Sequence, residues 1–231
     1  KRLLPFTLVS HIGYMIFGIA LSTDDGLTGA VFYVAHHITV QTTLFLVVGL
    51  MERRGGSTSL DRLGGLAKLA PALAVMFFVP AMSLAGIPPL SGFLGKAGLL
   101  QAGVHAGTPL AWALVAGGVL TSLLTLYAVV KAWNKAFWQG APADLPDTPL
   151  PKGMVGATAA LVVAGLGITV VAGPLYGYTE RAAETLRERG AYVATVLPEE
   201  GRGTGQSDDV TERENGDDAE AAEAAGEGAA P

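Results

Sequence analysis

Long apolar runs without charged residues constrain this chain more than any other feature. Five such runs fill most of the first 175 of its 231 residues. A helix of about 20 apolar residues crosses the hydrocarbon core of a bilayer. Only 15% of the residues are charged, whereas soluble domains carry about 25%. Five buried helices of a soluble protein would leave too little polar surface to cover them, so we expect an all-α integral membrane protein.

The expected membrane bundle covers residues 1–176 and consists of five transmembrane helices. These spans are expected at residues 3–21, 27–51, 69–104, 110–130 and 154–175. The third run is too long for one straight helix, and it contains Gly86, Pro88 and Pro89. Both prolines lack a backbone N–H, and Pro88 disfavours a helical conformation of the residue before it. We therefore expect a broken helix at Gly86–Pro89, with its freed carbonyls satisfied by water or by polar side chains such as Ser83 and Ser91.

Basic residues occur in every second connection between the spans. This pattern predicts the orientation of the chain in the membrane. The basic residues precede the first span and occupy the connections between the second and third spans and between the fourth and fifth spans. They are Lys1, Arg2, Arg53, Arg54, Arg62, Lys68, Lys131, Lys135 and Lys152. The other two connections carry Asp24 and Asp25, or only His105. Basic loops remain in the cytoplasm, so we expect a multi-pass protein of a bacterial plasma membrane whose C-terminal tail lies outside.

The composition changes after the last span. Residues 177–198 combine alternating charges with apolar positions, which is typical of an interfacial amphipathic helix followed by an apolar end. Residues 199–231 hold 11 acids and 2 bases, against 9 acids and 13 bases in the rest of the chain. This acidic tail has no aromatic residue. It can bury too little apolar surface to offset the entropy of ordering, so we expect it to be disordered.

Lys96 is the most informative single residue. Apart from Lys96, no residue with a formal charge lies between Lys68 and Lys131, and an ionised lysine at the bilayer centre costs about 2.5–3.5 kcal/mol on insertion scales. Such a residue must extend to the interface, find a partner or border water. Lys96 is several residues from either end of its segment and seven residues after Pro89, which favours a functional group over a lysine that merely extends to the interface.

Histidines on the neighbouring segments provide further candidates for proton transfer. His titrates near neutral pH, and His11, His36 and His37 all lie within expected spans. Tyr33, His37 and Gln41 fall at i, i+4 and i+8, so they form one polar stripe on a helix. A histidine bonded to a carbonyl group is the structural alternative, and for His36 the two interpretations are evenly balanced.

Several classes of site are not expected. The chain has no cysteine, and a metal site would need several more ligands near the adjacent His36 and His37. No Gly-rich phosphate loop, Ser/His/Asp set or redox cofactor motif occurs. We therefore expect no metal, no cofactor, no nucleic acid and no enzymatic activity of the chain itself. Gln101, five residues after Lys96, is a candidate for extending the polar path.

Four stretches together resemble a known family. Residues 1–14, 36–46, 84–96 and 126–138 resemble the antiporter-like proteins, which include the proton-pumping membrane subunits of respiratory complex I and the large subunits of Mrp-type cation/proton antiporters. The sequence KAWNKAFW at 131–138 and the ending from Pro174 onward most resemble the D subunit of the Mrp branch. The chain begins without Met, and it corresponds to the last five of the fourteen spans of this family, so we expect a C-terminal fragment.

The resemblance implies a role for several residues. The family's protonatable lysine on a broken helix corresponds to Lys96, and its histidine-bearing neighbouring helix corresponds to His36 and His37. Many relatives have Lys at the position of Gln41, so one charge of the family's hydrophilic axis is missing here. The family's other broken helix, with a Lys-Glu pair, lies upstream of this chain.

The combined prediction is a proton-translocating membrane subunit of a multisubunit Na⁺(cation)/H⁺ antiporter. Protons would be relayed through Lys96, His37, His36, Gln41, Tyr33 and His11. The expected partners are the other subunits of a hetero-oligomeric complex, membrane lipid, protons and monovalent cations. One alternative is a proton-pumping subunit of NADH-quinone oxidoreductase, which would make the chain part of a redox-driven enzyme. The other is a structural membrane subunit that conducts nothing.

Overall fold

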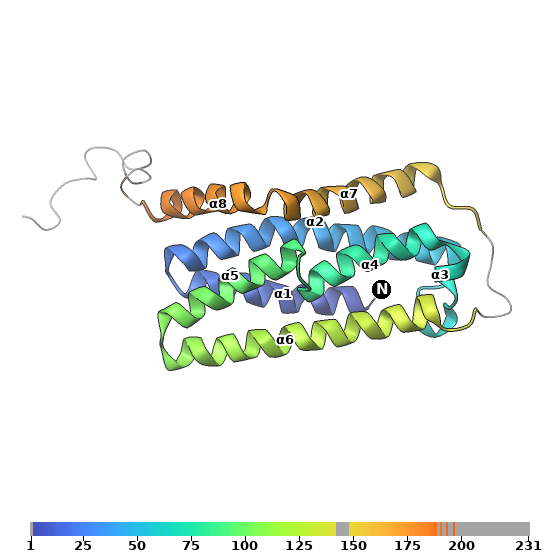
Figure 1. Cartoon of the computed structure of the whole chain (residues 1–231), viewed down its shortest axis with the longest axis horizontal. Coiled ribbons are helices and arrows are strands. Elements are labelled where there is room, and N and C mark those ends of the chain that lie inside the picture. Colours follow the sequence, from blue (N-terminus) through green and yellow to red (C-terminus); the bar gives the residue numbers. More distant parts are fainter. Residues whose placement is uncertain (1, 142–147, 189, 191–192, 194–195, 197–231) are drawn as a thin grey trace, which may run out of the picture. The chain divides into compact units, whose positions relative to one another are not determined.

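The computed structural model describes residues 2–141, 148–188, 190, 193 and 196. Within this part of the chain all regular secondary structure is helical (Figure 1). The helices are α1 (Leu3–Ala20), α2 (Asp24–Gly55), η1 (Leu60–Arg62), α3 (Leu66–Leu69), α4 (Pro71–Ala85), α5 (Ser91–Ala106), α6 (Pro109–Trp133), the π-helical turn η2 (Asn134–Trp138), α7 (Lys152–Val170) and α8 (Ala172–Arg187). The expected disordered tail, residues 199–231, lies outside the described residues.

Local sequence signals explain where the long helices begin and end. The hydroxyl of Thr23 accepts a hydrogen bond from the Gly26 N–H at 3.1 Å and caps the start of α2. Thr108 caps α6 in the same way. Such caps satisfy backbone N–H groups that have no partner in the first turn. At the other end of α2, Gly56 adopts a left-handed conformation with φ 66°, which glycine tolerates without steric cost.

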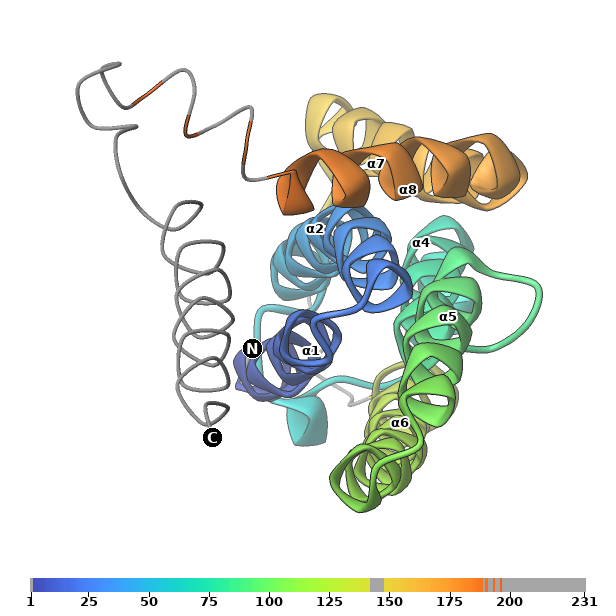
Figure 2. The ribbon, with the colours of Figure 1, turned by 90° about the vertical axis from the view of Figure 1, so that its left-hand side faces the viewer.

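Helix α2 lies at the centre of the bundle. It packs against α1, α4, α5 and α7, while α6 packs against α4 and α5 on another side (Figure 2). Its 32 residues correspond to about 48 Å at 1.5 Å per residue. Because four helices surround α2, its polar side chains are shielded on several sides. Tyr33, His36, His37 and Gln41 are all at most 4% exposed.

The segment expected as a broken span forms two helices, α4 and α5, separated by residues 86–90. Helix α4 ends where Gly86 adopts φ 89°, and its N–H donates to Met82 and Ser83 carbonyls. The Pro88–Pro89 peptide bond is cis. Helix α5 approaches α4 closely just after the break. A Cβ atom on Gly92 would lie only 1.8 Å from the backbone oxygen of Ser83, so only glycine fits here.

The last apolar segment differs from the single helix expected over 154–175. Helix α7 ends at Val170, and the amphipathic helix α8 begins at Ala172 rather than at residue 177. Pro174 explains the difference, because proline lacks an N–H, clashes with the carbonyl four residues earlier and is favoured in the first turn of a new helix. Ala172, Thr179 and Ala183 are the buried residues of α8.

Among the residues that the structure describes, four helices, α1, α2, α6 and α7, are long and apolar enough to cross a membrane, and α4 is a shorter apolar helix. The count of five spans therefore stays a prediction that requires α4 and α5 to cross together. The two ends of the bundle differ in charge. At one end Lys135 forms a salt bridge with Asp61 beside Arg2 and Lys131. At the other end of α2, Asp25 lies 3.6 Å from His105.

Candidate functional site

The ammonium group of Lys96 is held by the break between α4 and α5. Its Nζ donates hydrogen bonds to the backbone oxygens of Leu84 at 2.9 Å and Ala85 at 3.2 Å. Carbonyls in the last turn of a helix have no partner within that helix, and the negative end of the helix dipole favours a cation there. Lys96 itself is only 4% exposed. The helix break thus supplies carbonyl oxygens that stabilise the ammonium group of a lysine buried among apolar helices.

A second set of polar contacts begins at Ser91, just after the break. Nδ1 of His36 lies 2.9 Å from the hydroxyl oxygen of Ser91, the first residue of α5. The Ser91 N–H, which has no acceptor inside its own helix, donates to the hydroxyl of Thr169 on α7 at 3.0 Å. Both His36 and Ser91 are completely buried. Helices α2, α5 and α7 therefore meet at the start of α5 through polar groups.

His37 faces a different neighbour from His36. Adjacent helical residues point about 100° apart, so His36 faces α5 while the ring of His37 stacks on His11 of α1 at 5.2 Å between centroids. Nδ1 of His11 is also hydrogen-bonded to the hydroxyl of Tyr33. The ring of Tyr33 lies 5.4 Å from that of His36 and 6.1 Å from that of His37. The structure therefore brings together His11, Tyr33, His36 and His37.

Tyr14 connects this group to Lys96 and to α6. The Lys96 Nζ lies 5.3 Å from the centre of the Tyr14 ring, and the Tyr14 ring stacks on His11 at 6.0 Å. The Tyr14 hydroxyl bonds to the Gly118 oxygen and lies 2.8 Å from the Ser122 hydroxyl on α6. Sequence reasoning missed Tyr14, although its position three residues after His11 places both on one helix face.

Two residues that the sequence predicted for the polar path, Gln41 and Gln101, lie outside this group of side chains. The Gln41 side chain is buried, but its Nε2 donates to the backbone oxygen of Leu4 at 3.0 Å on α1. It is one further turn along α2 from His37, where α1 begins. Gln101 does not extend the path either, because it is exposed on α5. Five residues correspond to about 500° of helix rotation, which turns Gln101 away from the face of Lys96.

Several ring nitrogens in the cluster have no hydrogen-bond partner among the described residues. They are Nε2 of His11, Nε2 of His36 and both ring nitrogens of His37. Buried polar nitrogens are nearly always hydrogen-bonded, to protein or to water. The cluster, which we define as His11, Tyr14, Tyr33, His36, His37, Ser91 and Lys96, therefore has unused capacity for donors and acceptors. Lysine, histidine and tyrosine side chains all exchange protons with such neighbours.

Comparison with known protein sequences identifies the family of membrane proteins to which the chain belongs. Residues 1–125 match the family described as NADH:quinone oxidoreductase/Mrp antiporter, TM. The D subunit of the Na⁺/H⁺ antiporter of Alkalihalophilus pseudofirmus is 36% identical over 203 residues, which cover 86% of this chain and 40% of that protein. The N 2 subunit of the NADH-quinone oxidoreductase of Solidesulfovibrio magneticus is 36% identical over 186 residues, covering 80% and 39%. The chain thus spans about 40% of the length of these relatives.

Solved structures give the same result. A chain of the Mrp complex from Dietzia sp. superposes with a TM-score of 0.75 at 33% identity, covering 84% of this chain and 44% of that chain. A chain of respiratory complex I from Thermus thermophilus superposes with a TM-score of 0.65 at 30% identity, covering 78% and 38%. The predictions of an all-α membrane protein and of an antiporter-like fragment are confirmed. The chain belongs to the NADH:quinone oxidoreductase/Mrp antiporter membrane family.

Proposed function

We propose that this chain is the C-terminal part of a proton-translocating subunit of a multisubunit Na⁺(cation)/H⁺ antiporter. The observation that carries the proposal is the position of Lys96. Its Nζ lies within 3.2 Å of two carbonyl oxygens at a helix break. A buried ionisable residue in a membrane protein is costly and marks an ion or proton pathway by default. Broken helices supply ion sites in transporters for the same reason.

The cluster supports a relay around Lys96. Tyr14 connects Lys96 to His11, and His11 contacts both Tyr33 and His37. His36 extends the group to Ser91 at the start of α5. Water bound to the unpaired ring nitrogens would complete the connections, because water bridges polar groups nearly as well as a direct hydrogen bond does. In this scheme Lys96 takes up and releases the proton, and His37 and His36 pass it on.

The relatives are subunits of larger assemblies, which supports the cellular setting that we propose. The subunit works in a hetero-oligomeric complex in a bacterial plasma membrane, and it exchanges protons for monovalent cations. The basic ends of the helices lie in the cytoplasm, which places the C-terminal tail outside the cell. Because the chain spans about 40% of its relatives, the complete subunit is needed for transport.

The test is Lys96→Ala in the full-length subunit within the assembled complex, measured as cation-driven proton movement in inverted membrane vesicles. We expect antiport to be abolished while the complex still assembles. The matched control is Lys152→Ala, which removes an exposed lysine at the start of α7 and should leave antiport unchanged. Near-normal antiport in the Lys96→Ala complex would contradict the proposal and favour a structural subunit that conducts nothing.

A second candidate function is a proton-pumping subunit of NADH-quinone oxidoreductase. The observation that favours it is the 36% identity to an N 2 subunit of NADH-quinone oxidoreductase, equal to the identity with the D subunit of the antiporter. Subunits that co-purify with the native protein separate the two. Small antiporter subunits support the antiporter, whereas quinone-reducing peripheral subunits support the redox-driven pump.

A further inference from the structure

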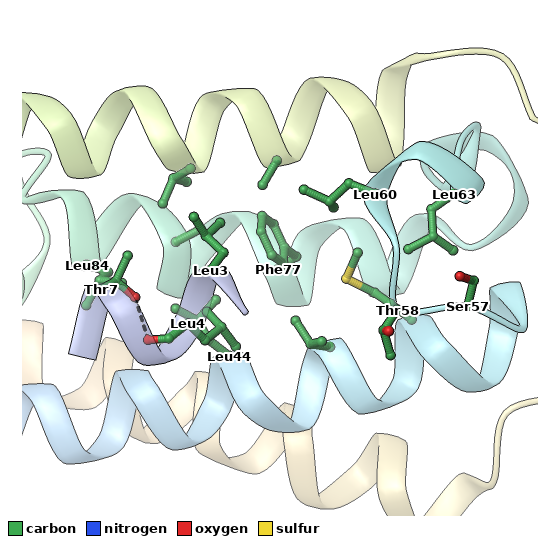
Figure 3. A pocket seen from close by; sticks show the side chains of 15 residues that line it. Leu3, Leu4, Thr7, Leu44, Ser57, Thr58, Leu60, Leu63, Phe77 and Leu84 are labelled. Carbon is green, nitrogen blue, oxygen red and sulfur yellow. Dashed lines mark hydrogen bonds between the residues drawn. The ribbon is translucent and has the colours of Figure 1, made fainter. Parts of the chain in front are cut away.

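An apolar groove lies between α1, α2, α4 and α6 (Figure 3). Its space, the open mouth included, amounts to about 600 Å³. Most of the lining is aliphatic or aromatic, as Figure 3 shows for Leu4, Leu44, Phe77 and Leu84. The loop with Thr58, Leu60 and Leu63 closes one end. An apolar groove of this kind fits hydrocarbon rather than water.

A basic hollow adjoins the groove at the end that the loop closes. Among the described residues its lining includes the bases Arg2, Lys131 and Lys135 and one acid, Asp61. Lys135 is engaged by Asp61 in a salt bridge. Arg2 and Lys131 form no salt bridge within the described part of the chain, and Nζ of Lys131 lies 5.8 Å from the centre of the Tyr127 ring. The hollow therefore keeps two positive charges available for an anion.

The groove and the hollow adjoin and share part of their lining. Leu3, Thr58, Leu60 and Ala132 line both of them. One molecule that occupies both must be an amphiphile with an anionic head and an apolar chain. We propose that the joint site binds one anionic phospholipid, with its phosphate against Arg2 and Lys131 and one acyl chain in the groove. Basic pockets between membrane helices bind such head groups by charge attraction.

The end of the groove opposite the loop lies next to the helix break between α4 and α5. The side chain of Leu84 lines the groove, and the backbone oxygen of the same residue accepts the hydrogen bond from Lys96. Thr7 lines the groove too, and its hydroxyl donates to the Leu4 oxygen that also accepts from Gln41. The acyl chain would therefore end against the residues that hold Lys96, while its head stays at the charged end of the bundle.

The experiment uses the full-length subunit in its purified complex, stripped of lipid and titrated with phosphatidylglycerol or phosphatidylcholine, with bound lipid counted by native mass spectrometry. We expect phosphatidylglycerol to bind in preference to phosphatidylcholine. Each basic residue near a lipid surface contributes roughly 1 kcal/mol, or about a factor of five in affinity. Arg2→Gln and Lys131→Gln should therefore each weaken phosphatidylglycerol binding about fivefold.

Matched variants distinguish lipid binding at this site from nonspecific electrostatic attraction between basic residues and anionic lipid. Lys152→Gln removes a base of the same expected membrane face that does not line the hollow. Because Lys152 is not part of the lining that would contact the phosphate, this change should weaken phosphatidylglycerol binding less than about twofold. Val48→Phe fills the groove and should weaken binding, whereas Leu46→Phe, on α2 but outside the lining, should not.

Three results would overturn the proposal. One is equal binding of the two lipids, and another is an equal loss in Lys152→Gln and Lys131→Gln. The third comes from a photo-crosslinking residue placed at Leu60: capture of a protein segment instead of lipid would show that another part of the complex fills the groove. None of these outcomes depends on whether Lys96 carries protons, so the inference can fail while the proposed function stands.

Discussion

The close approach of α4 and α5 at Gly92 yields the sharpest prediction. A Cβ atom added at Gly92 would lie 1.8 Å from the Ser83 oxygen, 2.8 Å from the Ser83 carbonyl carbon and 2.9 Å from Nε2 of His36. Two of these atoms are backbone and cannot rotate away. To restore even a 3.0 Å contact, the helices must separate by roughly 1.2 Å, and overpacking of this kind costs about 1–3 kcal/mol.

Gly92→Ala should therefore destabilise the subunit, although alanine is the better helix former by roughly 0.5–1 kcal/mol. The matched control is Gly49→Ala on α2, because nothing lies within 4 Å of its added Cβ. We expect the two changes to have opposite signs. The assay is the fraction of full-length complex that survives a heating series, followed by size-exclusion chromatography, with antiport measured on the same preparations.

The displaced α5 would also move Lys96 relative to the carbonyls of Leu84 and Ala85, so antiport should fall in Gly92→Ala even where the complex remains assembled. If Gly92→Ala is as stable and as active as Gly49→Ala, the contact with Ser83 does not fix the geometry of the break, and the reasoning is wrong.

Three smaller perturbations test other contacts. Thr169→Val removes the acceptor of the Ser91 N–H, a hydrogen bond worth about 1 kcal/mol, so exchange of that amide should accelerate about fivefold by hydrogen-exchange mass spectrometry, while Thr169→Ser should retain protection. Gln41→Leu should cost about 0.5–1.5 kcal/mol in heat stability but preserve antiport, because Gln41 bonds to a backbone oxygen of α1 outside the cluster; lost antiport would place it in the relay. The Lys135 ammonium, which donates to Asp61, holds the pKa of that carboxyl below its ordinary value, so the pair persists at neutral pH and is lost as the pH falls through the lowered pKa. In Lys135→Gln, ¹³C NMR of Asp61 should show titration in the ordinary range, and an unchanged titration would contradict this cause.

The sequence predicted the membrane class because the bilayer itself imposes the signal. A span needs about 20 apolar residues, and all its backbone groups must be paired internally. The Pro88-Pro89 pair likewise predicted the separation of α4 from α5, since neither residue can donate to a helix. The boundary between α7 and α8 at Val171 was harder to predict from the sequence, because Pro174 lies in an apolar stretch and proline can begin a helix as well as end one.

Individual side chains of the site were predicted by type but not by partner. A buried lysine and three histidines are conspicuous in an apolar chain, so Lys96, His11, His36 and His37 could be chosen without a structure. Tyr14 could not, because a tyrosine in a membrane segment is common at interfaces and its spacing to His11 is only one of many such pairs.

What the sequence alone determined is therefore the number of apolar runs, the place of the helix break and the residue types that carry charge within the membrane. The tertiary structure determined which of these residues contact one another. His11 contacts Tyr33 across 22 positions, His36 contacts Ser91 across 55, and Tyr14 contacts Ser122 across 108. Such pairings depend on the rotation and depth of each helix in the bundle. These are set by close contacts such as that of Gly92 with Ser83, and no single segment encodes them.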